Sequence, residues 1–245
     1  MTRHVTMMTI DDAEHYTQEQ RDEIIAGYPE HEREARARGV PVLGSGRVFP
    51  IPESQIKTPA IEIPHHWYHL GALDFGWDHP TAAVRLVHDR DADVVYVTHC
   101  YRVKQQTPIL HAAALKPWGK DMKWAWPHDG LQHDKQSGIQ LAEAYRDQGL
   151  RMMDERAQFP DDRGSGVEAG VMELLDRMQT ERFKVFDHLN DWFEEFRLYH
   201  RKDGLIVKER DDLMAATRYG IMELRNATPV NRPSRPIKYD SRGIV

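Results

Sequence analysis

The chain has 245 residues, of which 40% are hydrophobic and 29% are charged, and its formal net charge is −6. It contains no apolar run near the roughly 20 residues needed to cross a membrane, and its acidic start lacks the apolar core of a signal peptide. The single cysteine, Cys100, excludes a disulfide or a Cys-based zinc site within one chain. We therefore expect a protein of a reducing compartment whose overall surface does not bind nucleic acid tightly, although a local basic groove remains compatible with the charge.

The first 63 residues predict a polar, helical segment followed by a linker. Thr17 is placed to start a short helix, Pro29 separates it from a second one, and Gly39 ends that second helix. Residues 40–64 contain five prolines among extended residues, which favours a linker on a surface over a core element. The "GSGR" within them is not a phosphate-binding loop, because no Gly-Lys-Ser/Thr follows.

The predicted core, residues 64–226, opens with three strands. The first is apolar and ends at Asp74, and the next two, 81–89 and 93–104, alternate in polarity across a short turn, as antiparallel partners do. A helix over 107–119 follows, with Thr107 as its cap and Pro108 in its first turn.

The second half of the predicted core alternates strands and helices. We expect a strand over 122–129 that ends at Asp129, a helix over 137–149, a strand over 150–157 and a helix over 164–183. A hairpin over 196–209 has Asp203-Gly204 in its turn, and a last helix covers 211–226. This order predicts an α/β fold in which a mixed sheet, with an antiparallel three-strand opening, has helices on both faces. Residues 227–245 are expected to be a flexible basic tail.

Aspartates stand at comparable points of three predicted elements. Asp74 lies in an apolar strand, where a charge is costly to bury unless it is paired or bound to a metal. Asp129 precedes a glycine, so a plain turn is an alternative reading. Asp211 and Asp212 open the last helix, where Asp can serve as a cap. Carboxylates are also the usual ligands of Mg²⁺ and Mn²⁺, so a metal site is the second reading of this set.

Three motifs together make the chain resemble the nuclease domain of the large terminase subunit of tailed bacteriophages: "HLGALDFGWDHPTAAV", "WPHDG" and "KERDDLMAATRYG". The resemblance implies a ribonuclease H-like fold that binds two divalent ions, Mg²⁺ or Mn²⁺, and cuts concatemeric viral DNA during genome packaging. It assigns the catalytic, metal-binding roles to Asp74, Asp129 and Asp211, with Asp212 as an auxiliary ligand or cap. A helical wheel places Asp212, rather than Asp211, nearer the packed face.

The same resemblance covers the N-terminal segment, which is similar to the part that joins the ATPase domain to the nuclease in that family. Its partners would be double-stranded DNA, the terminase ATPase domain, the small terminase subunit and the portal protein, in the host cytoplasm and without a membrane. The phosphate-binding loop of the family's motor is missing here, which predicts a fragment or a separately encoded nuclease. The sequence also has Ala215-Ala216 where many relatives have Asp-Ala.

Weaker candidates surround this set. Arg201 and Lys202 at the hairpin tip, and Lys135 at the rim, are candidates for DNA phosphate contacts. Asp78 and His79 either approach the site or form a solvated turn. The alternative functions are a non-catalytic docking module of a packaging motor and another ribonuclease H-like enzyme, such as a resolvase. A sugar-kinase-like ATP binder is disfavoured, because a second glycine-rich phosphate motif is missing.

Overall fold

The computed structural model describes residues 9–28, 33, 36–37, 46–119, 121–131, 140–159 and 166–229. Helix α1 (Gln18–Ala26) confirms the first predicted helix, and Thr17 and Gln20 exchange the hydrogen bonds of a capping box at its start. The second predicted helix falls largely outside the described residues. In the part of the chain that is described, no helix has the length and apolarity needed to cross a membrane.

The centre of the molecule is a mixed sheet, which has eight strands within the described residues. Its order is β1-β7-β4-β3-β2-β5-β6, with β10 paired to β2. The strands are β1 (Lys57–Thr58), β2 (Tyr68–Asp74), β3 (Thr81–Asp89), β4 (Val94–Val103), β5 (Lys123–Ala125), β6 (Arg151–Met152), β7 (Phe183–Phe186) and β10 (Thr228–Pro229). Strands β2, β3 and β4 are antiparallel neighbours, whereas β5 is parallel to β2 and β7 is parallel to β4. The predicted mixed sheet with a three-strand antiparallel opening is confirmed.

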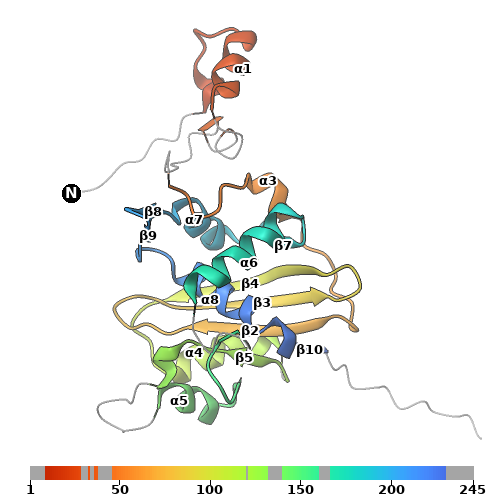
Figure 1. Cartoon of the computed structure of the whole chain (residues 1–245), viewed down its shortest axis with the longest axis vertical. Coiled ribbons are helices and arrows are strands. Elements are labelled where there is room, and N and C mark those ends of the chain that lie inside the picture. Colours follow the sequence, from red (N-terminus) through yellow and green to blue (C-terminus); the bar gives the residue numbers. More distant parts are fainter. Residues whose placement is uncertain are drawn as a thin grey trace, which may run out of the picture.

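Helices cover both faces of this sheet. Figure 1 shows α6 and α8 on one face and α4 and α5 on the other. Their bounds, with those of the remaining helices, are α3 (Glu53–Ile56), α4 (Pro108–Leu115), α5 (Leu141–Asp147), α6 (Val167–Gln179), α7 (Asn190–Leu198) and α8 (Asp212–Met222). Short 3₁₀ turns are η1 (Ile10–Asp12), η2 (Lys116–Trp118), η3 (His128–Leu131) and η4 (Leu224–Asn226), and a separate hairpin pairs β8 (Arg201–Lys202) with β9 (Leu205–Ile206).

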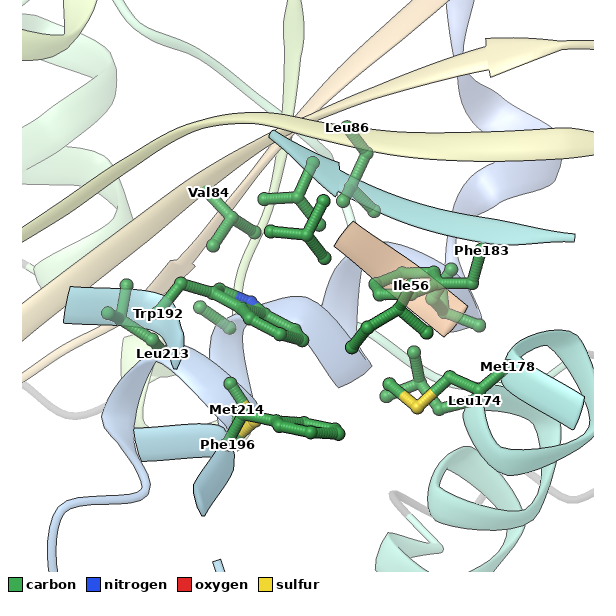
Figure 2. Close-up of a cluster of buried hydrophobic side chains, with 14 of the residues drawn as sticks. Ile56, Val84, Leu86, Leu174, Met178, Phe183, Trp192, Phe196, Leu213 and Met214 are labelled. Atoms are coloured by element: carbon green, nitrogen blue, oxygen red, sulfur yellow. The ribbon is translucent and has the colours of Figure 1, made fainter. Parts of the chain in front are cut away.

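Each face of the sheet has its own apolar core. On the α6 and α8 side, Trp192 and Phe196 of α7 lie against Leu213 and Met214 of α8, as Figure 2 shows. On the other side, Trp124 and Trp126 are buried and pack with residues of α4 and α5. Helix α8 packs directly on β2 and β3. Helix α8 therefore forms a layer between the sheet, at β2 and β3, and the helices α6 and α7.

The segment before residue 64 departs from the prediction. Phe49 and Ile56 are buried in the core, and Lys57–Thr58 form β1, which pairs in parallel with β7. The expectation that residues 40–64 lie on a surface is therefore wrong for Val48, Phe49, Ile51 and Ile56, which are buried, whereas Pro50, Ser54 and Lys57 are exposed. The buried side chains of this segment belong to the same core cluster as Trp192 and Phe196 of α7.

Several boundaries in the second half also differ. The helix predicted to reach 183 ends at Gln179, and Phe183 instead begins β7. The hairpin predicted over 196–209 is shorter, because residues 196–198 continue α7. At the C-terminus, Thr228 and Pro229 pair with β2, so the expected tail is ordered over these two residues, and residues 230–245 lie outside the described part.

Candidate functional site

The site is built around the end of β2. This strand is apolar and buried from His69 to Leu73, and Asp74 is its last residue, half-buried where the strand leaves the core. The register pairs Asp74 with Ala82 of β3. Strand β5 runs parallel to β2, so both strands deliver their following residues to the same edge of the sheet. Asp74 is therefore at the predicted position.

Asp129 reaches this edge from β5, although by a different route from the predicted one. The strand stops at Ala125, and Asp129 lies four residues later in the 3₁₀ turn η3. That turn presses close to the end of β2: a Cβ on Gly130 would lie 2.9 Å from the Phe75 ring and 2.4 Å from the Trp126 ring. Only glycine permits this approach, which holds Asp129 beside the residue that follows Asp74.

Asp211 and Asp212 arrive from the third element, α8. Asp211 is the N-cap residue and Asp212 is the first residue of the helix, as predicted. Asp212 is 8% exposed, whereas Asp211 is half-buried, so the helical wheel correctly placed Asp212 nearer the packed face. The helix packs on β2 and β3, and Gly220, two turns further on, lies over Ala72 and Leu86. Because Gly220 lies over the middle of β2 and β3, the start of α8 lies toward the end of β2 that carries Asp74.

The four carboxyl groups influence one another. Burial raises the pKa of Asp74 well above its ordinary value, and the charges of Asp212, Asp211 and Asp129 raise it further. Burial, followed by the charge of Asp212, raises the pKa of Asp211. Burial also raises the pKa of Asp212, while the charge of His79 lowers it. The carboxylates therefore repel one another when no cation is bound.

A buried arginine that the sequence reading did not select partly offsets this repulsion. Arg218 of α8 is 5% exposed, and its charge lowers the pKa of both Asp74 and Asp211. Its Nε and Nη1 have no hydrogen-bond partner among the described residues, and its guanidinium carbon lies 4.4 Å from the centre of the Tyr219 ring. The sequence signal for Arg218 was its spacing of seven residues, about two helical turns, from Asp211.

A second group that sequence reasoning missed lies beneath the doublet. Glu195 of α7 is fully buried, and its Oε2 accepts a 2.6 Å hydrogen bond from the backbone N–H of Leu213. Its Oε1 accepts a 2.8 Å hydrogen bond from Arg102 of β4. Burial raises the pKa of Glu195 to about 7, although the bonds from Arg102 and Leu213 act in the opposite direction. No local pattern around Glu195 signals this contact, because its partners lie far away in the sequence.

The donor set fits a hard divalent cation. Asp74, Asp129, Asp211 and Asp212 supply only carboxylate oxygens, which Mg²⁺ and Mn²⁺ prefer. A cation would also remove the repulsion that raises the pKa of Asp74. As the side chains stand, no three His, Cys, Asp or Glu side chains within the described ranges form a finished ligand set.

The residues predicted to contact DNA are Arg201, Lys202 and Lys135, and the structure describes the first two. Arg201 in β8 pairs with Glu168 of α6 through two hydrogen bonds of 2.8 and 2.5 Å, so part of its charge is already offset. Lys202 is exposed at the hairpin tip. Lys135 lies outside the described residues. Nearer the doublet, the charges of His79, Arg102 and Lys104 lower the pKa of Asp212, against the larger effect of its burial.

Comparison with known families matches both parts of the chain. The model of the terminase RNaseH-like domain matches residues 71–224, which include all four aspartates. The model of the N-terminal part of the T4-like terminase large subunit matches residues 1–56. Large terminase subunits of Salmonella phage P22 and Enterobacteria phage LP7 are 50% and 52% identical over 236 and 222 residues, or 96% and 90% of this chain. These residues are 47% and 46% of the relatives, so the chain spans about half of their length.

Solved structures agree with this assignment. The nuclease domain of the P22 large terminase is 47% identical, with a TM-score of 0.71, and the match covers 76% of this chain and 96% of that domain. The nuclease domain of the SPP1 large terminase, solved with bound Mn, is 18% identical with a TM-score of 0.53, covers 72% of this chain and 99% of that domain, and supports the fold alone. The predicted ribonuclease H-like fold and the resemblance to large terminases are thus confirmed, and the chain belongs to the family of terminase RNaseH-like domains.

Proposed function

We propose that this chain is a divalent-metal-dependent DNA endonuclease that cuts concatemeric viral DNA during packaging. The observation that carries this proposal is the position of Asp74, whose pKa is raised by burial and by three further aspartates from two other elements. Such a cluster of partly buried carboxylates is costly without a cation. The relatives named above are nucleases or large terminases by their descriptions, which supports the same function.

In this proposal, Asp74, Asp129 and Asp211 hold two divalent ions, Mg²⁺ or Mn²⁺, with Asp212 as an additional ligand. When bound, the ions lower the pKa of the attacking water and offset the charge that develops on the phosphodiester. Arg218 limits repulsion among the carboxylates before cations bind, since its charge lowers the pKa of Asp74 and Asp211. His79 and Lys104, whose charges lower the pKa of Asp212, would help to hold a DNA phosphate near the doublet. Contacts to the DNA backbone alone give weak sequence preference.

The remaining partners follow from the family. We propose that the chain acts with a terminase ATPase domain, a small terminase subunit and the portal protein, on double-stranded DNA in the host cytoplasm. Lys202 and Arg201 at the hairpin, together with Lys135, are proposed to contact DNA phosphates. Arg201 would have to exchange Glu168 for a phosphate group to do so.

Cleavage of supercoiled plasmid tests the enzyme proposal. We expect nicking and linearisation with Mn²⁺ or Mg²⁺, none with EDTA, and none by an Asp74→Asn variant. Intact plasmid with both ions would instead favour a docking module. Cleavage that persists in EDTA would exclude the metal mechanism. A four-way DNA junction serves as the second substrate, because a resolvase would cut it in strong preference to linear duplex.

A further inference from the structure

The start of α8 is held from outside the helix. An aspartate at the N-cap usually accepts a hydrogen bond from a free N–H of the first turn. Here the side chain of Asp211 makes no capping hydrogen bond. The N–H of Leu213 is bound instead by Glu195 Oε2 of α7, at 2.6 Å. The capping function is thus supplied by another helix, which leaves the Asp211 side chain free of that task.

Glu195 ties this helix start to a defined level of the sheet. Its second oxygen accepts a 2.8 Å hydrogen bond from Arg102 Nη1. Arg102 pairs in register with Ala82 of β3, and Ala82 pairs with Asp74 of β2. Arg102 and Asp74 are therefore level with each other two strands apart, a separation of roughly 10 Å. The bridge from Leu213 through Glu195 to Arg102 consequently fixes the first turn of α8 against the same level of the sheet that carries Asp74.

The burial of this bridge argues for a role beyond stability. Glu195 is 0% exposed, and a buried ion pair adds little net stability compared with apolar side chains of similar size. Its hydrogen bonds do fix the position of the carboxylate, however, because each oxygen accepts from a different described donor, Oε1 from Arg102 and Oε2 from Leu213. Groups that orient metal ligands in this way commonly set metal affinity.

We propose that Glu195 is a positioning residue for the metal site, which sets the location of Asp211 and Asp212 relative to Asp74. This inference rests on the proposed function. Glu194, the preceding residue of α7, provides a matched control. It binds the same arginine, Arg102, at 3.0 Å, and its other described bond goes to Arg210 at 3.1 Å, both through side chains at a partly exposed position. Its neutralisation therefore weakens the Arg102 network without touching the cap of α8.

The experiment compares Glu195→Gln with Glu194→Gln in the full chain. The glutamine side chain has a single carbonyl oxygen, which can accept from Leu213 or from Arg102 but cannot reach both. Without metal, we expect amide hydrogen exchange at Leu213 to accelerate at least about tenfold in Glu195→Gln and to stay unchanged in Glu194→Gln. Calorimetric titration with Mn²⁺ should show an affinity about 10- to 100-fold weaker in Glu195→Gln only. In plasmid cleavage, kcat should fall while KM for DNA stays near that of the wild type.

Each alternative outcome is distinct. Faster exchange at Leu213 with wild-type Mn²⁺ affinity and kcat would make Glu195 a structural cap only and overturn the proposal. Equal losses in both variants would assign the effect to the charge of Arg102, and would overturn it as well. If the wild type neither binds Mn²⁺ nor cuts DNA, the proposed function fails first, and the exchange data still report whether the cap exists.

A second variant covers the case in which Glu195→Gln does not fold. The double variant Glu195→Met/Arg102→Met replaces the pair with apolar side chains, which such sites tolerate. We expect it to fold and to remain weak in Mn²⁺ binding, because Leu213 has lost its acceptor. Wild-type affinity in this folded double variant would overturn the positioning role.

Discussion

The close approach of α8 to the sheet depends on Gly220, and its replacement by alanine tests how tightly the site depends on that approach. A Cβ at Gly220 would lie 2.5 Å from Leu86 Cδ1 and 3.2 Å from Ala72 Cβ. Carbon atoms in good contact are about 3.5–4.0 Å apart. A gap of about 1 Å must therefore open between the helix and β3, or Leu86 must leave its position in the core.

Two opposing effects set the stability of Gly220→Ala. Alanine gains about 1 kcal/mol over glycine inside a helix. Overpacking a dense core costs about 1–3 kcal/mol, and Leu86 has little room to yield because it is fully buried. Overpacking should prevail, with a net loss of about 1–2 kcal/mol and a Tm lower by roughly 2–8 °C. Cleavage should fall further, by about 10- to 100-fold at a temperature where the variant is folded, because a displaced α8 misplaces Asp211 and Asp212.

Urea unfolding and plasmid cleavage measure the two effects separately. Leu86→Val provides the rescue, since it removes the reach of the methyl group that the new Cβ would meet. The double variant Gly220→Ala/Leu86→Val should be less destabilised than the sum of the single variants. A Gly220→Ala protein that is more stable than the wild type and cuts normally would refute the argument. Strict additivity in the double variant would show that Leu86 is not the obstacle.

The other predictions concern the carboxylates themselves. The pKa of Asp74 is raised in the folded chain above the ordinary value of 3.8, so the folded state binds a proton more tightly than the unfolded state. The free energy of unfolding without metal therefore falls as the pH rises from 3.8 through the folded pKa. Asp74→Asn should therefore be more stable than the wild type at pH 7 in EDTA and should lose this advantage in acid. Added Mn²⁺ should not raise the stability of this variant. Equal unfolding curves of the two proteins at pH 7 would contradict the repulsion. Asp211→Asn should be folded and inactive, whereas Asp212→Asn should retain partial activity, as plasmid cleavage measures. Inactivity of Asp212→Asn alone would make the buried member the main ligand, and normal cleavage by both variants would place the third ligand elsewhere.

The sequence predicted those features that depend on local chemistry. Asp74 was identifiable because a charge in a buried strand requires a partner, and the doublet because it begins a helix with an apolar face. The strand β7 was missed because nothing between Thr180 and Phe183 breaks a helix strongly, and β7 itself has only four residues. The segment containing Phe49 and Ile56 was missed because its prolines resemble those of a linker, although tertiary contacts bury its apolar side chains.

Long-range partners were beyond local patterns. The bond between Glu195 and Leu213 joins α7 to α8, and its other partner, Arg102, lies 93 residues away from Glu195. The position of Asp129 differed for a related reason: β5 ends early, and the approach of Gly130 to Phe75, rather than the strand itself, sets where Asp129 lies. Such contacts exist only once the sheet has brought distant segments together.

The burial of the segment before β2 has a mechanical consequence. The match to the N-terminal terminase model ends at residue 56, one residue before β1. The backbone of Gly46 and Val48 is hydrogen-bonded to that of Arg201 and Tyr199, respectively. A force applied to the preceding chain would therefore act on these hydrogen bonds beside the hairpin before it acts on β2. A recombinant fragment trimmed to begin at residue 64 would lose that edge along with Phe49 and Ile56, and would expose the apolar surface that they cover. The two family modules are therefore better separated upstream of residue 46 than at the proline-rich stretch itself.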